Sequence, residues 1–149
     1  MKNKLLTLLL LALFPLFSFA TLGQNIASIN TDNKVLGSSR ATMVKPITTQ
    51  TGYQFYTVKD PHNIIINEYV NAQGQVFAIS WSGQRYPNIA QLLGNKYMQL
   101  MKGASITHFG MKIANYRNND FTMQMVSSPG LIDGIAYIPS QIPVNVSLA

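Results

Sequence analysis

The chain has 149 residues and no cysteine, and 11 Lys and Arg stand against 5 Asp and Glu. This length allows one small domain at most. The absence of cysteine excludes disulfide scaffolds, thiol nucleophiles and cysteine-ligated zinc or iron–sulfur sites. Only 11% of the residues are charged while 47% are hydrophobic, which excludes a disordered polyelectrolyte. The composition therefore predicts a small, weakly basic globular protein that is rich in uncharged polar residues.

The N-terminus has the pattern of a secretory signal peptide. Lys2 and Lys4 precede an uncharged apolar run, Leu5–Phe17, and small residues at Ser18 and Ala20 fit a signal peptidase. The run is shorter than the roughly 20 residues that span a bilayer. We expect cleavage after Ala20, export to the periplasm or cell exterior, and no stable membrane span afterwards. The alternative is an uncleaved membrane anchor.

The remaining chain divides into segments that differ in residue composition. Residues 21–52 are rich in Ser, Thr, Asn, Gln and Gly, and predict a loosely held polar arm with a short helix around Ser28–Leu36. Residues 53–143 predict the folded domain, and residues 144–149 a C-terminal tail. Removing Lys2 and Lys4 leaves 9 basic and 5 acidic residues, a net charge of +4. The basic residues are scattered, so we expect no nucleic-acid partner.

Six runs of aromatic and β-branched residues predict strands. They are Tyr53–Lys59, Ile64–Asn71, Gln75–Ser82, Met111–Tyr116, Phe121–Ser127 and Ile132–Ile138. Between the second and third runs, Asn71–Gly74 predicts a type I turn with Gly74 in the left-handed region. The register that follows pairs Tyr69 with Phe77, Asn67 with Ile79 and Ile65 with Trp81. It collects the large side chains on one face.

A single amphipathic helix is predicted between the third and fourth runs. Pro87 suits a first turn, and Gly103 suits a C-terminal cap. The apolar arc at helical spacing contains Ile89, Leu92, Leu93, Tyr97, Leu100 and Met101. The fold class expected is α+β: an antiparallel sheet of about five or six strands with one main amphipathic helix packed on one face.

The hairpin region carries a resemblance to a known family. The block Glu68–Gly83 is the most specific part. Shorter matching blocks are Leu22-Gly23, Ala27-Ser28-Ile29 with Asp32, Pro87-Asn88-Ile89, Leu92-Leu93-Gly94 and Gly134–Pro139. Over residues 22–143 the chain resembles the bacterial family catalogued as domain of unknown function 2844. Asn88 stands where the family pattern suggests an acidic residue. The resemblance implies a small exported bacterial protein, with no activity or substrate to transfer.

Few residues have the spacing of a catalytic centre. His62 and His108 have no metal-like neighbour at i+2, i+3 or i+4. The carboxylates are Asp32, Asp60, Glu68, Asp120 and Asp133. Asp60, Asp120 and Asp133 adjoin turn signals, where Asp commonly binds local backbone. We therefore interpret both histidines as ordinary loop or strand-end residues, with a general base or ligand as the alternative, and expect no catalytic residue, metal or cofactor.

Three residues stand out as candidate binding residues. Glu68 lies mid-strand and is either a solvated edge residue or a paired functional one. Trp81, with Tyr69 and Phe77, is either core beneath the helix or a platform that stacks on a sugar or peptide. Lys96 falls within the apolar arc, where its ammonium either reaches water or pairs with Glu68 or an anionic ligand.

Two functional hypotheses follow. The favoured one is a non-catalytic module of the bacterial envelope that binds an envelope component or another exported protein. The alternative is a small secreted hydrolase that uses His62 or His108 with a carboxylate. Neither the ligand nor the oligomeric state follows from the sequence.

Overall fold

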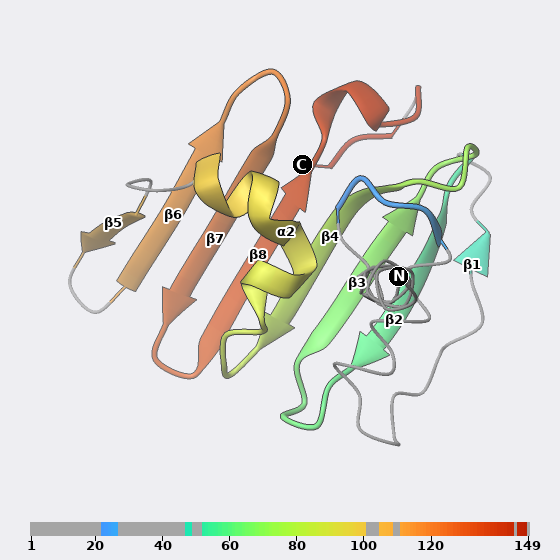
Figure 1. Cartoon of the computed structure of the whole chain (residues 1–149). Coiled ribbons are helices and arrows are strands. Elements are labelled where there is room, and N and C mark those ends of the chain that lie inside the picture. The colour runs from blue at the N-terminus through green and yellow to red at the C-terminus, as the bar shows by residue number, and fades with distance from the viewer. Residues whose placement is uncertain are drawn as a thin grey trace, which may run out of the picture.

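The described part of this chain contains eight strands, one α-helix and one short 3₁₀ helix (Figure 1). The computed structural model describes residues 22–26, 47–48, 52–100, 105–108, 111–144 and 146–148. The strands are β1 Ile47–Thr48, β2 Gln54–Lys59, β3 Ile65–Val70, β4 Val76–Gly83, β5 Ser105–His108, β6 Met111–Arg117, β7 Thr122–Ser128 and β8 Leu131–Tyr137. Helix α2 spans Ile89–Leu100, and a short 3₁₀ helix, η2, spans Pro139–Gln141.

All eight strands belong to one antiparallel sheet in the order β1-β2-β3-β4-β8-β7-β6-β5. The chain leaves the central strand β4, crosses one face as α2, and returns from the far edge through β5 to β8 (Figure 1). The predicted α+β class with one helix is confirmed. The six predicted strands match β2, β3, β4, β6, β7 and β8 to within one residue at each end, and the short outer strands β1 and β5 are additional.

The turn between β3 and β4 has the predicted geometry, but the predicted register is wrong. The Gly74 N–H donates to Asn71 O over 2.9 Å, and Gly74 has a φ of 77°. Val70 then pairs with Val76, whereas Tyr69 pairs with Ala78, so Phe77 is an extra residue in a β-bulge. Beyond the bulge every predicted pair is shifted by one residue, and Trp81 faces Ile66 rather than Ile65. Tyr69 and Trp81 therefore lie on opposite faces of the sheet.

The bulge has a cause that is distant in the sequence. The Gly23 N–H donates to Val76 O over 2.8 Å, and the Val76 N–H donates to Gln24 O over 2.9 Å. The carbonyl of Phe77 accepts instead from the Ile138 N–H. Residues 22–26 thus hold the start of β4, and the side chain of Leu22 is buried in the core, so this segment of the predicted polar arm is not loosely held.

Helix α2 begins after Asn88, whose Oδ1 accepts the N–H of Gln91 over 3.2 Å, an N-cap contact. Pro87 therefore precedes the helix rather than opening it. Gly94, with φ 73° and ψ 166°, interrupts the helical backbone between two turns. Because the break changes the phase of the second turn, a single continuous arc does not describe which residues face the sheet. Leu92, Leu93 and Tyr97 are buried.

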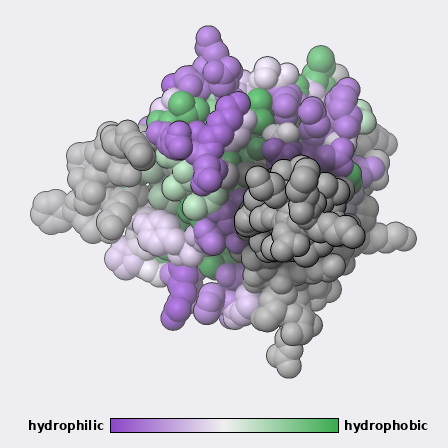
Figure 2. Space-filling view, viewed as in Figure 1, coloured by the Kyte–Doolittle hydropathy of each residue, from purple (hydrophilic) through white to green (hydrophobic). Residues whose placement is uncertain are grey.

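The core lies between α2 and the sheet. Leu92 and Leu93 share one buried cluster with Trp81, Ile66 and Met123. The predicted burial of Trp81 beneath the helix is confirmed, at 2% exposure. Seen from the helix side, hydrophilic side chains cover much of the described surface (Figure 2).

Some expectations concern residues that the structure does not describe. The signal peptide over residues 1–20, the short helix around Ser28–Leu36 and the cap at Gly103 lie outside the described ranges. Among the helices that are described, none has the length and apolar character required to cross a membrane.

Candidate functional site: a groove on the open face of the sheet

The sheet has a second face that α2 does not cover, which we call the open face. The side chain of Trp81 is buried on the helix side. Gly134 pairs with Trp81, and Met125 pairs with Gly134, so both positions face the helix side as well. Side chains alternate along a strand, so their neighbours in β4, β8 and β7 point to the open face.

Two cross-strand rows on the open face are set by the register. The first runs from β2 to β6 and contains Thr57, Asn67, Ser80, Ile135, Gln124 and Asn115. The second contains Lys59, Ile65, Ser82, Asp133, Val126 and Ile113. The first row is uncharged, and all its members except Ile135 carry a hydroxyl or an amide.

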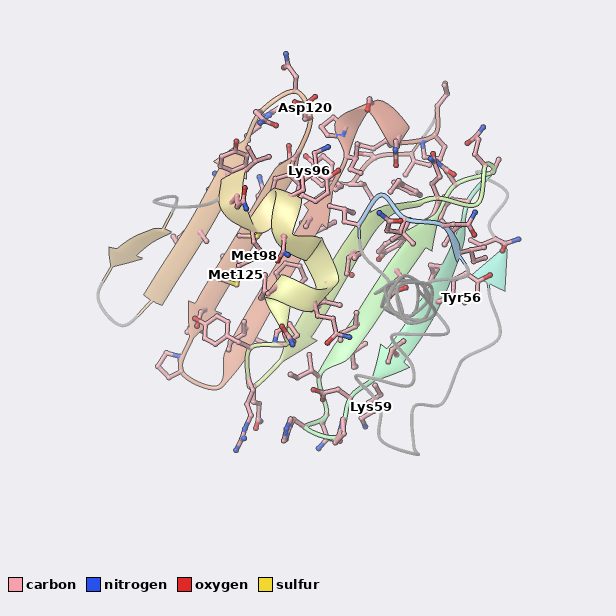
Figure 3. The ribbon with its side chains drawn as sticks, viewed as in Figure 1. Tyr56, Lys59, Lys96, Met98, Asp120 and Met125 are labelled. Carbon is pink, nitrogen blue, oxygen red and sulfur yellow. The ribbon has the colours of Figure 1, made fainter. Side chains whose placement is uncertain are left out.

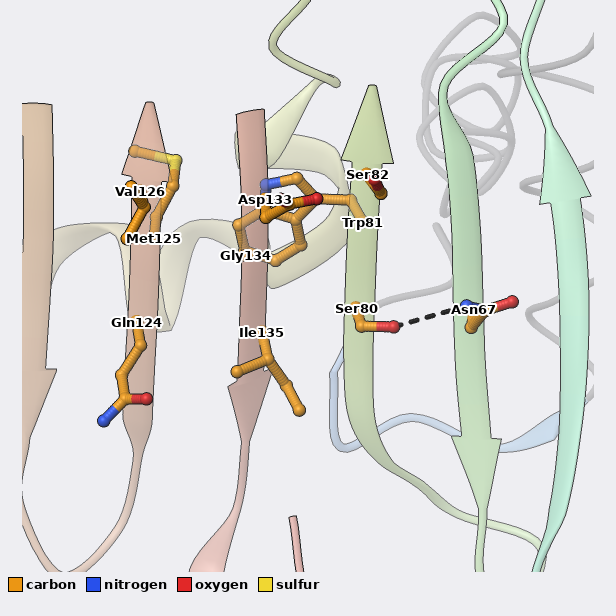
Figure 4. Close-up of a pocket in the computed structure, with 10 residues that line it drawn as sticks. All are labelled: Asn67, Ser80, Trp81, Ser82, Gln124, Met125, Val126, Asp133, Gly134 and Ile135. Carbon is orange, nitrogen blue, oxygen red and sulfur yellow. Dashed lines mark hydrogen bonds between the residues drawn. The ribbon is translucent and has the colours of Figure 1, made fainter. Parts of the chain in front are cut away.

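A shallow groove of about 380 Å³ lies over the middle of these rows, on strands β3, β4, β8 and β7 (Figure 4). Its volume falls within the range of about 300–1,000 Å³ that is usual for ligand pockets. The polar side chains that line it are Asn67, Ser80, Ser82, Gln124 and Asp133. Ile135 and Val126 add apolar surface. We call this site the open-face groove.

Hydrogen bonds orient the polar side chains at one end of the groove. The Thr57 hydroxyl donates to Asn67 Oδ1 over 2.7 Å, and Asn67 Nδ2 donates to Ser80 Oγ over 3.4 Å (Figure 4 shows the second). The Tyr69 hydroxyl also lies 3.4 Å from Ser80 Oγ. These hydrogen bonds orient the amide of Asn67.

Among the described residues that line the groove, Asp133 is the one that carries a carboxylate. Asp133 is the third residue of β8 and follows the Pro129–Gly130 turn closely, as predicted, but among the described residues its carboxylate does not bind the turn backbone. Within the described ranges, its carboxylate makes no hydrogen bond or ion pair with another side chain. A half-buried carboxylate that faces a groove is available to accept hydrogen bonds from a ligand.

An aromatic cluster borders the groove on the side of the bulge. The ring of Tyr69 lies 5.9 Å from Phe55, 6.0 Å from Tyr53 and 6.3 Å from Phe77, between ring centroids. The bulge places Phe77 in this cluster rather than in the core under the helix. The predicted single aromatic face is thus divided between the two sides of the sheet.

All three candidate binding residues lie on the helix side of the sheet. Glu68 pairs with Ile79 and Tyr56, not with Ala78 as the predicted register required, and its side chain has 0% exposure. It is therefore not a solvated edge residue. The indole of Trp81 packs against Gly134, where a Cβ would overlap the ring. Trp81 lines the groove at the β4–β8 pair, although its indole lies on the helix side of the sheet (Figure 4).

Lys96 is exposed on α2, and its Nζ lies 5.1 Å from the centroid of the Tyr97 ring, a cation–π distance. Figure 3 places it at the end of the helix that lies towards Asp120, while Lys59 lies at the opposite end of the sheet. Glu68 and Trp81 are thus buried on the helix side, whereas Lys96 is exposed on that side.

The two histidines are far apart in the fold. His62 is exposed in the β2–β3 turn, where its backbone N–H donates to Asp60 Oδ1 over 2.8 Å. His108 ends the outermost strand β5, five strand steps from β3, or about 24 Å. Asp60 also accepts the Ile64 N–H, which confirms its expected role in a turn. Within the described ranges, no group of three or more His, Asp or Glu residues could hold a metal ion.

Comparison with known proteins identifies the family. A model of the family described as "Protein of unknown function (DUF2844)" matches residues 18–149. The chain belongs to this family. The match extends over the whole described structure, so the sheet, α2 and the open-face groove all lie within the family region, and the resemblance expected from the hairpin block is confirmed. No curated protein and no solved structure gives a significant match.

Proposed function

We propose that the mature chain is a non-catalytic exported module that binds an envelope component or another exported protein through the open-face groove. The observation that carries the proposal is the groove itself, in which hydroxyl and amide side chains, the Asp133 carboxylate and the apolar Ile135 and Val126 lie together on the sheet face that α2 does not cover. Ser82 and Gln124 are exposed there, while Asp133 is half-buried.

The chemistry of the groove favours binding over hydrolysis. Glycoside hydrolysis requires two carboxyl groups that face each other across the scissile bond, and the residues that line the groove include one. A base of the histidine type would have to come from the β2–β3 turn or from β5, and both lie outside the groove. Binding alone requires only what the groove contains, which is oriented donors and acceptors beside apolar surface.

Site-specific photo-crosslinking in the native envelope tests the proposal. A benzophenone amino acid replaces Ser82 in the groove, and as a matched control it replaces Gln99, which is exposed on α2. We expect a discrete adduct in the exported fraction from position 82 and none from position 99. Adducts of equal yield from both positions, or none from position 82, would contradict binding through the groove.

A further inference from the structure

We infer that the open-face groove binds a linear, uncharged polysaccharide that lies across strands β3, β4, β8 and β7. The inference rests on the proposed function and adds the chemical class of the ligand. The groove crosses three inter-strand steps, about 14 Å, and is open along its length rather than enclosed. This shape suits a short stretch of an extended polymer better than a compact small molecule.

Backbone pairing favours a ligand that is recognised by side chains. Strands β4, β8 and β7 each pair on both sides, so their N–H and C=O groups are used within the sheet. An extended peptide that adds to a sheet forms main-chain hydrogen bonds, and these are available at an edge strand, not at the middle of a face. A ligand in the groove must therefore offer its own hydroxyls or amides to side chains.

The polar side chains of the groove match sugar hydroxyls. The hydroxyls of Ser80 and Ser82 and the amides of Asn67 and Gln124 each donate and accept, as sugar hydroxyls do. Asn67 and Ser80 are already held by hydrogen bonds, so little conformational freedom is lost when they bind.

The charge of the groove selects against acidic polymers. Asp133 is an acceptor that neighbours Ser82 across the β4–β8 pair, and the lining residues that the structure describes include no Lys, Arg or His. A carboxylate accepts charge-assisted hydrogen bonds from hydroxyl or acetamido N–H groups, and it repels a uronic acid. Ile135, between Ser80 and Gln124 in its row, presents apolar surface to the C–H face of a sugar ring.

NMR titration of the mature protein tests the inference. The probes are the β-1,4-linked tetramers of glucose and of N-acetylglucosamine, and the acidic control is the tetramer of galacturonic acid. We expect at least one neutral probe to shift the amide signals of Ser80, Ser82, Asp133 and Gln124, and the acidic probe to leave them unchanged. Asp133→Asn should weaken neutral binding about ten-fold or more, and Asp120→Asn, an exposed turn carboxylate remote from the groove, should have no effect.

Other outcomes overturn the inference. The inference fails if neither neutral probe at about 10 mM shifts the amide signals of the groove, or if the shifts are confined to α2. It also fails if the acidic tetramer binds as strongly as the neutral ones. Shifts of the groove signals that depend on protein concentration without any sugar would instead indicate that a second copy of the chain binds there. If Asp133→Asn does not fold, Gln124→Ala replaces it, because Gln124 is exposed. A protein adduct at position 82 without any sugar-induced shift would refute the polysaccharide and leave the proposed function standing.

Discussion

A single methyl group added at Gly134 should destabilise the domain strongly. An ideal Cβ at this position would lie 2.7 Å from Trp81 Nε1 and closer still to two ring carbons. Ordinary contacts between carbon atoms are about 3.5–4.0 Å, so the indole or the β4–β8 pair must move by more than 1 Å. Overpacking of this kind costs about 1–3 kcal/mol, and we expect Gly134→Ala to lie at the upper end, near 3 kcal/mol.

A destabilising effect would point to the contact with Trp81, because backbone conformation alone predicts that Gly134→Ala stabilises the domain. Gly134 does not have a positive φ, and Gly→Ala at a compatible strand position stabilises by about 0.4–1 kcal/mol. The three atoms nearest to the added methyl group all belong to the indole of Trp81. In a Trp81→Leu background the cost of Gly134→Ala should therefore disappear, which gives a coupling energy of about 3 kcal/mol.

Urea unfolding followed by circular dichroism measures this cycle, since Trp81 is the only tryptophan and the Leu variant has no indole fluorescence. Gly130→Ala is the control. Gly130 has a φ of +81° and open space around its Cβ position, so its cost of about 1 kcal/mol should be the same in both backgrounds. Equal costs for Gly134→Ala in the two backgrounds would refute the packing of Trp81 on β8.

Other predictions concern the turn, the helix, the leader and the histidine. Asn71→Ala should cost about 1–2 kcal/mol in urea unfolding, because its Oδ1 accepts two backbone N–H groups of the β3–β4 turn; a cost below 0.5 kcal/mol would contradict this. Asn88→Ala should lower the free energy of unfolding by about 1 kcal/mol through loss of the N-cap. Asn88→Asp, measured in the same way, should keep the N-cap and the wild-type stability. Mass spectrometry of the exported protein should find a chain that begins at Thr21, whereas an intact leader on a membrane-bound product would refute cleavage after Ala20. His62→Ala should leave crosslinking from position 82 unchanged; its loss, in a variant that still folds, would indicate that the β2–β3 turn belongs to the binding site.

The sequence predicts the strands and the burial of Trp81 because both depend on local alternation and side-chain size. Each of the six expected strands is present, and the β3–β4 turn forms as Asn71 and Gly74 indicate. The register fails just after the Val70–Val76 pair, where Phe77 is the extra residue of the bulge. The hydrogen bonds around the bulge come from Gly23 and Gln24, more than 50 residues earlier in the chain, and from Ile138. No local pattern in the hairpin sequence shows these distant contacts.

The groove could not be predicted from single residues. Its lining comes from four strands, and its row of hydroxyls and amides appears only when the order β3-β4-β8-β7 and the register are known. For Asp133 the sequence offers a local signal, because the Pro129-Gly130 turn starts β8 at Leu131. Alternation with the buried Ile132 then places Asp133 on the opposite face. Glu68 and Trp81 are candidates by residue type alone, and the fold places both on the buried side of the sheet.

The central claim is that the open face is the binding surface, and hydroxyl-radical footprinting tests it most directly. Val126 and Ile65 on this face are each 44% exposed, and Tyr86, in the loop between β4 and α2, is 45% exposed. Each residue is compared between the purified mature protein and the same protein in its native envelope preparation. We predict reduced modification of Val126 and Ile65 in the envelope and unchanged modification of Tyr86. Unchanged modification of Val126 and Ile65, with or without protection of Tyr86, would contradict the claim.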